Sequence, residues 1–222
     1  MIGKILDLIN TKEDEGKAGD KRRAEEMAIL EQEIAQMLMA EQRAPEPDLR
    51  SIGLFSDVSE EKTAELIHAM LYLDELNKLS PKEEQKPITF YLSTYGGSAD
   101  DMFGMYDVMR VVRHTSEIHT VGLGKVMSAG VILLAAGTKG KRKIGKNCRV
   151  MIHSVIAGNH GPLHNLLNEM GAVEQIQKMY IDCLVAETSL TKKQLKKLLE
   201  RKVNVYLSAE EAVEYGIADI II

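Results

Sequence analysis

Hydrophobic residues from about position 50 onward alternate between short apolar runs and longer segments with helical spacing. The short runs, bounded by turn residues, predict strands at 52–55, 88–92, 117–122 and 149–155. Helices are predicted between them, including one at 100–112. Strands that alternate with helices in this way predict an α/β fold built on right-handed crossovers.

The longest helical stripe lies in a predicted helix at 163–187. Its positions recur at a spacing of three or four residues: Leu167, Met170, Val173, Ile176, Gln177, Tyr180 and Leu184. A projecting helix has no core of its own in which to bury such a stripe. The pattern therefore predicts that the chain forms an oligomer.

The first 48 residues have a different pattern and are predicted to form an extension outside a main domain at 49–222. Residues 11–26 are densely charged, which is typical of a solvated linker or a flexible helix start. An amphipathic helix is then expected up to the prolines at 45 and 47, on the spacing of Met27, Leu30, Ile34 and Met37. This helix is expected to dock on its own domain or on a neighbouring subunit; the alternative is a removable propeptide or a gating segment.

Composition narrows the class of protein. A chain of 222 residues suits one domain with a sizeable core plus the extension, and a net charge of −5 argues against nucleic acid as the main partner. No apolar run is long enough to span a bilayer, and the N-terminus lacks an uninterrupted apolar core of a secretory signal. A cytoplasmic protein, or one of an organelle stroma or matrix, is therefore expected. The two cysteines, Cys148 and Cys183, are interpreted as buried hydrophobes rather than a disulfide.

Candidate chemistry centres on one serine and one histidine. Ser128 lies between a glycine-containing turn and an apolar helix, and His153 closes a predicted strand 25 residues later. A serine hydroxyl becomes a nucleophile when a base takes its proton, and a helix start supplies N–H groups for the oxyanion. Each residue also has a structural interpretation: Ser128 could cap the helix, and His153 could be a core residue.

A resemblance to a known family runs from near Arg50 to the C-terminus and is carried by several short motifs in order. They are Leu71-Tyr-Leu-Asp74, Tyr95-Gly-Gly-Ser98, Met105-Tyr-Asp107, Gly124-Lys-Val-Met-Ser128-Ala-Gly130, Arg149-Val-Met-Ile-His153 and the run from Tyr206 to Gly216. Together they resemble the proteolytic subunit of the Clp protease, the ClpP family of serine endopeptidases. The resemblance implies a spiral of β-α units, like that of ClpP and the crotonases, with a projecting strand-helix handle at about 156–187.

The family's site residues carry over by position. Ser128 would be the nucleophile, His153 the general base, and the amides of Gly97 and Ala129 the oxyanion hole. Asn204 stands where the family has its orienting aspartate; its oxygen can accept a hydrogen bond from imidazole but cannot stabilise imidazolium by charge. A nearby acid such as Glu200 is an alternative orienter.

Two further positions depart from the family. Tyr95 replaces the usual proline before the two glycines, so a less rigid loop is expected. Lys125 stands at a position that is usually small or neutral; a Ser–Lys dyad is the alternative to a surface or interface residue. His160 and His164 are expected to be exposed rather than metal ligands, and neither a metal nor a cofactor is predicted.

The resemblance implies two stacked seven-membered rings of this chain, or rings shared with a paralogue, in which unfolded polypeptides supplied by a hexameric AAA+ ATPase are hydrolysed. The chain has no P-loop and so is not predicted to be the motor. Two alternatives remain at this point. One is a weakly active or inactive structural ring subunit, suggested by Asn204 and Tyr95. The other is a crotonase-type enzyme, which would bind coenzyme A.

Overall fold

The computed structural model describes residues 18–41, 48–200 and 204–222, and the chain divides into two compact units at Leu49 and Arg50. In the first unit, α2 (Ala18–Glu41) is a helix of 24 residues. It begins inside the charged segment, because Ala, Lys, Arg and Glu are all strong helix formers. The side chains of Met27 and Ile34 are exposed. The side chain of Met37 is not described, and the two prolines lie outside the described residues.

In the second unit, the described residues form a seven-stranded sheet. Its strands are β1 (Ser51–Leu54), β2 (Ile88–Thr94), β3 (Ile118–Met127), β4 (Lys143–Ile144), β5 (Arg149–Ile152), β6 (Val205–Leu207) and β7 (Ile220–Ile221). The order is β1-β2-β3-β4-β7, and every one of these pairs is parallel. The predicted α/β fold is confirmed.

The long strand β3 is the point at which the sheet divides. Val121 and Gly122 pair with β4, whereas the residues from Lys125 to Met127 pair with β5. β5 then pairs with β6 in antiparallel register. The carboxyl end of β3 therefore brings the chain to Ser128 beside the end of β5, which leads to His153.

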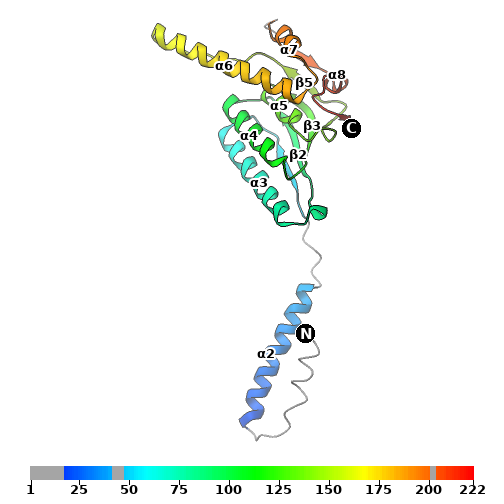
Figure 1. Cartoon of the computed structure of the whole chain (residues 1–222). Helices are drawn as coiled ribbons and strands as arrows, with labels where there is room; N and C mark the ends of the chain where they lie inside the picture. Colours follow the sequence, from blue (N-terminus) through cyan, green and yellow to red (C-terminus); the bar gives the residue numbers. More distant parts are fainter. Residues whose placement is uncertain (1–17, 42–47, 201–203) are drawn as a thin grey trace. The chain divides into compact units, whose positions relative to one another are not determined.

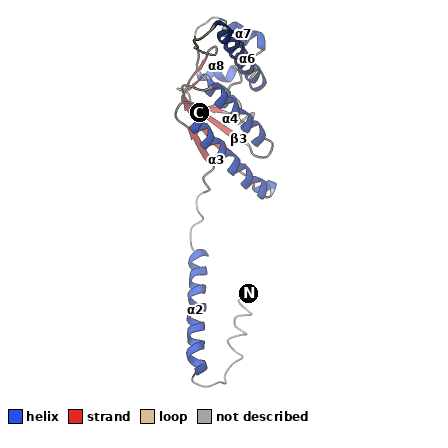
Figure 2. Cartoon of the chain, turned by 90° about the vertical axis from the view of Figure 1, so that its left-hand side faces the viewer, coloured by secondary structure: helices blue, strands red, loops and turns tan. Residues whose placement is uncertain are grey.

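Helices cover this sheet, as Figures 1 and 2 show. They are α3 (Glu60–Leu79), α4 (Ala99–Val112), α5 (Ala129–Ala135), α6 (Leu163–Glu187), α7 (Lys192–Leu199) and α8 (Ala209–Glu214), with a short 3-10 turn, η1 (Lys82–Glu84). α3 and α4 lie side by side, and α5 packs among α4, α6 and β3. All seven residues of α5 are buried, which explains why its sequence carries no charge.

Helix α4 begins close to the Gly96-Gly97 turn and is fixed there by its cap. The hydroxyl of Ser98 accepts a hydrogen bond from the N–H of Asp101, and two acidic residues occupy the first turn. The face of α4 that packs on the core is apolar and includes the buried residues Met102 and Met105. This packing holds the start of α4, and with it the turn, against the core.

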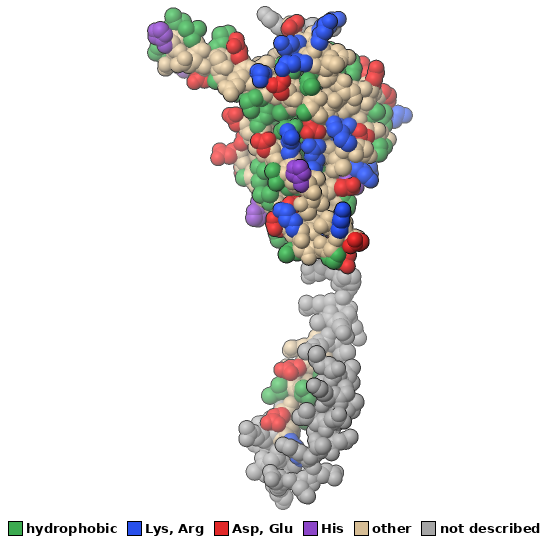
Figure 3. All heavy atoms as spheres, in the orientation of Figure 1, with side chains coloured by type: hydrophobic (Ala, Val, Ile, Leu, Met, Phe, Trp, Pro, Cys, Tyr) green, Lys and Arg blue, Asp and Glu red, His purple; other side chains and the backbone are tan. Residues whose placement is uncertain are grey.

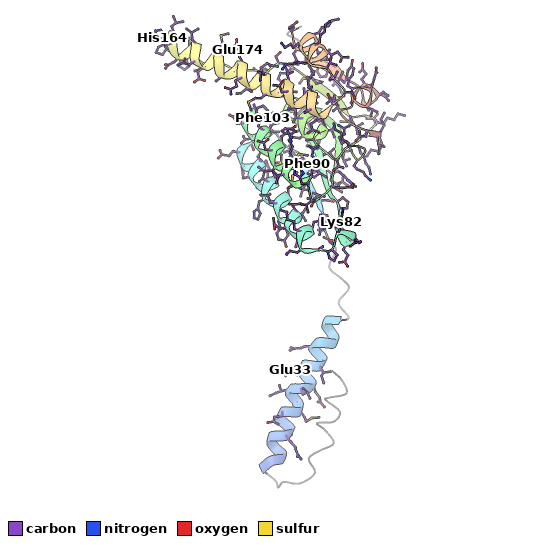
Figure 4. The ribbon with its side chains drawn as sticks, in the orientation of Figure 1. Glu33, Lys82, Phe90, Phe103, His164 and Glu174 are labelled. Atoms are coloured by element: carbon purple, nitrogen blue, oxygen red, sulfur yellow. The ribbon has the colours of Figure 1, made fainter. Side chains whose placement is uncertain are left out.

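Helix α6 is buried only at its C-terminal end. Tyr180, Ile181, Leu184 and Glu187 are buried, whereas the N-terminal half extends away from the sheet, with His164 near its free end in Figure 4. The prediction of one continuous interface stripe was wrong for Tyr180 and Leu184, because these positions pack into the core of their own domain. The residues before α6 form no strand, so the expected strand of the handle is absent from 153–162.

A buried polar cluster holds the C-terminal end of α6. The carboxylate of Glu187 accepts hydrogen bonds from Arg113, at 2.9 and 3.1 Å, and from the hydroxyl of Tyr106 at 3.0 Å. Arg142 donates to the Glu187 carbonyl at 2.8 Å and pairs with Asp219. Burial opposes the charged form of Glu187, but the Arg113 guanidinium outweighs it and lowers the pKa of that carboxyl.

The core of the second unit consists of aliphatic residues, methionine and alanine, with Phe90 at its centre (Figure 4). Both cysteines are free, as predicted; Cys148 is buried, whereas Cys183 is only half-buried. Burial raises the pKa of each thiol to about 11. None of the described helices is long and apolar enough to cross a membrane.

Candidate active site

Ser128 has an unusual backbone conformation at the junction of β3 and α5. Its φ of 53° and ψ of −122° make it the only non-glycine residue with positive φ among the residues that the structure describes. Such a conformation costs about 1–3 kcal/mol and persists only where its surroundings enforce it. Here the N–H of Ser128 donates to the Met151 carbonyl at 2.8 Å, and its own carbonyl accepts from Val131 N–H at 3.0 Å.

This conformation bears on the interpretation of Ser128 as a helix cap. The hydroxyl makes no capping hydrogen bond to α5. Instead, the Oγ atom lies 2.8 Å from Nε2 of His153. The capping alternative was therefore wrong, because the strained backbone turns the hydroxyl away from the helix and toward the imidazole.

The Gly96-Gly97 turn lies directly against Ser128. A Cβ atom at Gly96 would come within 2.6 Å of the Ser128 Cβ, and one at Gly97 would come within 2.2 Å of the Val58 carbonyl oxygen. Both glycines also have positive φ, 105° and 150°. Only glycine fits at these positions, and the fit brings the turn against the serine.

Hydrogen bonds on both sides hold this turn. The Val58 N–H donates to the Gly96 carbonyl at 2.7 Å, and the Ser98 N–H donates to the Val58 carbonyl at 2.9 Å. The hydroxyl of Thr94 accepts from the Gly96 N–H at 3.0 Å. These bonds form because β1 leads into Val58, which pairs with Gly97 as an isolated parallel bridge.

Two backbone N–H groups near Ser128 donate no hydrogen bond within the described part of the chain. Ala129 is the first residue of α5, so its N–H has no partner within the helix. The N–H of Gly97 makes no hydrogen bond to any described residue. Both residues line the same pocket as Ser128. Unpaired donors beside a nucleophile are what an oxyanion requires.

His153 follows β5 and is half-buried at the edge of the pocket. Beyond it the chain leaves the sheet, because the N–H of Val155 donates to the side-chain oxygen of Gln177 at 2.7 Å rather than to a strand. β5 therefore ends at Ile152, three residues before the predicted end. Among the described residues, no side chain hydrogen-bonds to the second ring nitrogen of His153.

Asn204 lies immediately before β6, and the sheet register sets its position. Ile152 pairs with Val205, so the next pair outward would join His153 and Asn204. Residues directly opposite in an antiparallel pair have Cβ atoms about 4.5–5.5 Å apart. Asn204 is exposed and makes no hydrogen bond to His153. Glu200, at the end of α7, is also exposed and makes no hydrogen bond to His153 either.

A pocket of about 370 Å³ opens beside Ser128 and His153. The apolar part of its wall comes from α4, α6 and the segment after β5: Met102, Phe103, Val155, Ile156, Ile176 and Tyr180. Phe103 lies on α4 below α6 in Figure 4. A pocket of this kind accepts an apolar side chain next to the serine hydroxyl.

Tyr180 is a site residue that the sequence interpretation assigned to a subunit interface. Its hydroxyl donates to the Ser128 carbonyl at 3.3 Å, and its ring lines the pocket. Burial raises the pKa of Tyr180, so the hydroxyl remains a donor. Its spacing from Ile176, four residues on one helical face, was visible in the sequence, but the spacing did not reveal which surface that face contacts.

Comparison with known proteins gives separate evidence on the family of the chain. The family model described as "Clp protease" matches residues 47–222. The chain belongs to the Clp protease family. Among its relatives, the chain is 33% identical to the ATP-dependent Clp protease proteolytic subunit 2 of Corynebacterium jeikeium over 171 residues, 77% of each chain. It is 31% identical to the ATP-dependent Clp protease proteolytic subunit 1 of Prochlorococcus marinus over 173 residues, 78% of this chain and 84% of the relative.

The departures from the family pattern lie at the edge of this site. Lys125 makes no hydrogen bond to Ser128 within the described residues; its Nζ atom lies 4.6 Å from the ring centroid of Tyr95. The structure therefore gives no support to a Ser–Lys dyad. His160 and His164 are both exposed, and no group of three potential metal ligands occurs in the described part of the chain.

Proposed function

We propose that the chain is a proteolytic subunit of a Clp protease, a serine endopeptidase that hydrolyses peptide bonds. The observation that carries this proposal is the 2.8 Å contact between Ser128 Oγ and His153 Nε2, at a serine with strained backbone beside two unpaired amides. This contact and the family favour an active peptidase over an inactive ring subunit. They also favour it over a crotonase-type enzyme, which has no need of a serine–histidine pair.

In the proposed mechanism, His153 accepts the hydroxyl proton while Ser128 Oγ attacks the carbonyl carbon of the scissile peptide bond. The amides of Gly97 and Ala129 donate to the oxygen of the tetrahedral intermediate. His153 then gives the proton to the leaving amine, and the carbon–nitrogen bond breaks to leave an acyl-serine. A water molecule, deprotonated by His153, attacks this ester and releases the carboxylate, which regenerates the serine.

Asn204 is proposed to orient the imidazole. The register of β5 and β6 supports this role, because it directs Asn204 toward His153. Its amide oxygen would accept a hydrogen bond from Nδ1–H and so fix the tautomer in which Nε2 is free to take a proton. An amide carries no charge, however, so the imidazolium is stabilised less than it would be by a carboxylate.

Assembly and supply of substrate are proposed on the family. The relatives are named ATP-dependent, and this chain has no P-loop, so a separate Clp ATPase would deliver unfolded polypeptides. The free half of α6 exposes Leu163, Leu167 and Met170, and Figure 3 shows hydrophobic side chains at its end. Such a surface would be covered by further copies of the chain or by a paralogue in stacked rings.

The proposed nucleophile is tested by Ser128→Ala in the full chain. We expect complete loss of labelling by a fluorophosphonate and of short-peptide cleavage, with the particle size unchanged in ultracentrifugation. Ser56→Ala, which changes an exposed serine after β1, is the matched control and should keep both activities. Peptide cleavage that survives in Ser128→Ala would disprove the mechanism.

The proposed orienter is tested by Asn204→Asp. A carboxylate in this position would stabilise the imidazolium, so kcat for a short peptide should rise. Asn204→Ala should lower kcat, because the imidazole would lose its only proposed partner. If both variants match the wild type in an assembled particle, another group orients His153.

A further inference from the structure

Tyr95 and Lys125, the two residues that depart from the family pattern next to the glycine turn, contact each other. The Nζ atom of Lys125 lies over the Tyr95 ring, 4.6 Å from its centroid. A cation at this distance from an aromatic face is attracted by the ring. Among the described residues, Lys125 has no ion pair, so the ring is its principal partner.

The sheet brings this pair together through an irregularity in register. Leu92 pairs with Gly122 and Thr94 pairs with Val126, so two steps along β2 correspond to four along β3. The extra residues of β3 lie between Gly122 and Val126, and Lys125 is one of them. Tyr95 directly follows Thr94, the β2 residue that pairs with Val126. The two side chains therefore leave neighbouring strands at the same end of the sheet.

A second cation lies on the neighbouring strand on the other side of Lys125. Lys125 pairs in register with Arg149 of the parallel strand β5, and like charges at close range repel. The guanidinium of Arg149 lies 4.8 Å from the ring centroid of Tyr206, on β6. Each cation thus contacts a tyrosine on its own side, and Lys125 is turned toward β2 and Tyr95.

We infer that Lys125 is a positioning residue for the oxyanion hole, acting through the ring of Tyr95. This inference rests on the proposed serine peptidase function. Tyr95 is the residue between Thr94 and Gly96, so a fixed ring restricts the peptide that leads into the Gly96-Gly97 turn. That turn touches Ser128 and carries the Gly97 N–H, whose direction decides how well it meets the oxyanion.

The physical reason is the conformational freedom of this segment. Two consecutive glycines lose more backbone entropy on ordering than other residues do, and no proline precedes them to restrict the chain. Tyr95 is 65% exposed, so packing alone does not fix it. A cation over its exposed face supplies a restraint from the adjacent strand.

The test is a double-mutant cycle with Lys125→Met, Tyr95→Leu and the double variant, made in the full chain. The readouts are kcat and KM for a short peptide and the second-order rate constant of fluorophosphonate labelling at Ser128. We expect each single variant to lower kcat and the labelling rate by about three- to tenfold, with KM nearly constant. The double variant should be no slower than the slower single variant, because both changes remove the same contact.

Conservative variants and a control complete the experiment. Lys125→Arg and Tyr95→Phe keep a cation and a ring, so they should restore most of the rate lost in the Met and Leu variants. Lys141→Met removes an exposed lysine before β4 and should leave the rates unchanged. Melting temperature and particle size are measured for every variant.

Three outcomes would overturn the inference. Strictly additive effects would mean that the two residues act independently, and a rise in KM at constant kcat would mean that Tyr95 only shapes the pocket. A lower melting temperature with unchanged kcat would mean a purely structural contact. A wild-type protein that does not react with the fluorophosphonate would instead overturn the proposed function, and the inference with it.

Discussion

Both halves of α6 carry apolar residues at helical spacing, but their surroundings differ. In the C-terminal half, Tyr180 and Leu184 lie in the core, and Glu187 is fixed by Arg113 and Tyr106. In the N-terminal half, Leu167 and Met170 are 57% and 64% exposed. Figure 3 shows the exposed half as an arm with hydrophobic side chains at its end.

The apolar stripe of α6 therefore has two roles, one in each half of the helix. The buried half belongs to the domain and lines the pocket next to Ser128, through Ile176 and Tyr180. The exposed half makes few contacts within its own domain, so its apolar residues are available to another chain. Substitutions in the two halves should therefore change different properties, stability in one and assembly in the other.

The largest effect on stability is expected at the buried end. Glu187→Gln removes the charge that pairs with the half-buried Arg113 guanidinium, which costs about 1–3 kcal/mol. Thermal unfolding should show a clearly lower melting temperature. Glu174→Gln, on the exposed part of the same helix (Figure 4), is the control and should unfold like the wild type. Equal melting temperatures for the two variants would contradict the role of the cluster.

At the exposed end we expect a change in assembly instead. Leu167→Glu combined with Met170→Glu places charges on a surface that is proposed to be covered in the particle, where an unpaired charge is strongly unfavourable. Ultracentrifugation should show smaller particles, while circular dichroism remains that of the folded domain. Asn168→Glu adds a charge to the same end but outside the apolar stripe, and should leave the particle intact. A normal particle in the double variant would refute the interface.

The pH dependence of stability sharpens the same comparison. The pKa of Glu187 is lowered from 4.5 in the folded protein, so its contribution is fully present above about pH 4.5 and is lost as the pH falls through the lower, folded value. The melting temperature of the wild type should therefore fall more steeply below this pH than that of Glu187→Gln. Parallel curves for the two proteins would show that another group controls the acid transition.

The smallest effect is expected where the buried half meets the site. Tyr180→Phe removes the hydrogen bond to the Ser128 carbonyl but keeps the ring, so kcat should fall about two- to fivefold with little change in melting temperature. Tyr72→Phe, which changes an exposed tyrosine on α3, is the control. If kcat is unchanged in Tyr180→Phe, the hydroxyl does not help to hold the strained backbone of Ser128.

Much of the fold and of the candidate site could be predicted from local patterns. The alternation of short apolar runs with helical segments predicted the α/β fold. The first and last residues of α6 were also predicted correctly. Ser128 and His153 were singled out by their motifs, and the structure brings Oγ and Nε2 within 2.8 Å. Local sequence suffices here because side-chain periodicity and glycine-containing turns are properties of short segments.

The contacts between distant segments were decided by the tertiary structure. The sequence contained Tyr180, Tyr95 and Lys125, but it did not indicate that Tyr180 would reach the Ser128 carbonyl or that Lys125 would lie over Tyr95. Periodicity identifies which residues share a face and leaves open what that face meets. The division of β3 between β4 and β5, and the change in its register beside β2, determine which side chains become neighbours. These depend on how the whole sheet is assembled, because strand pairing joins residues that are far apart in the chain.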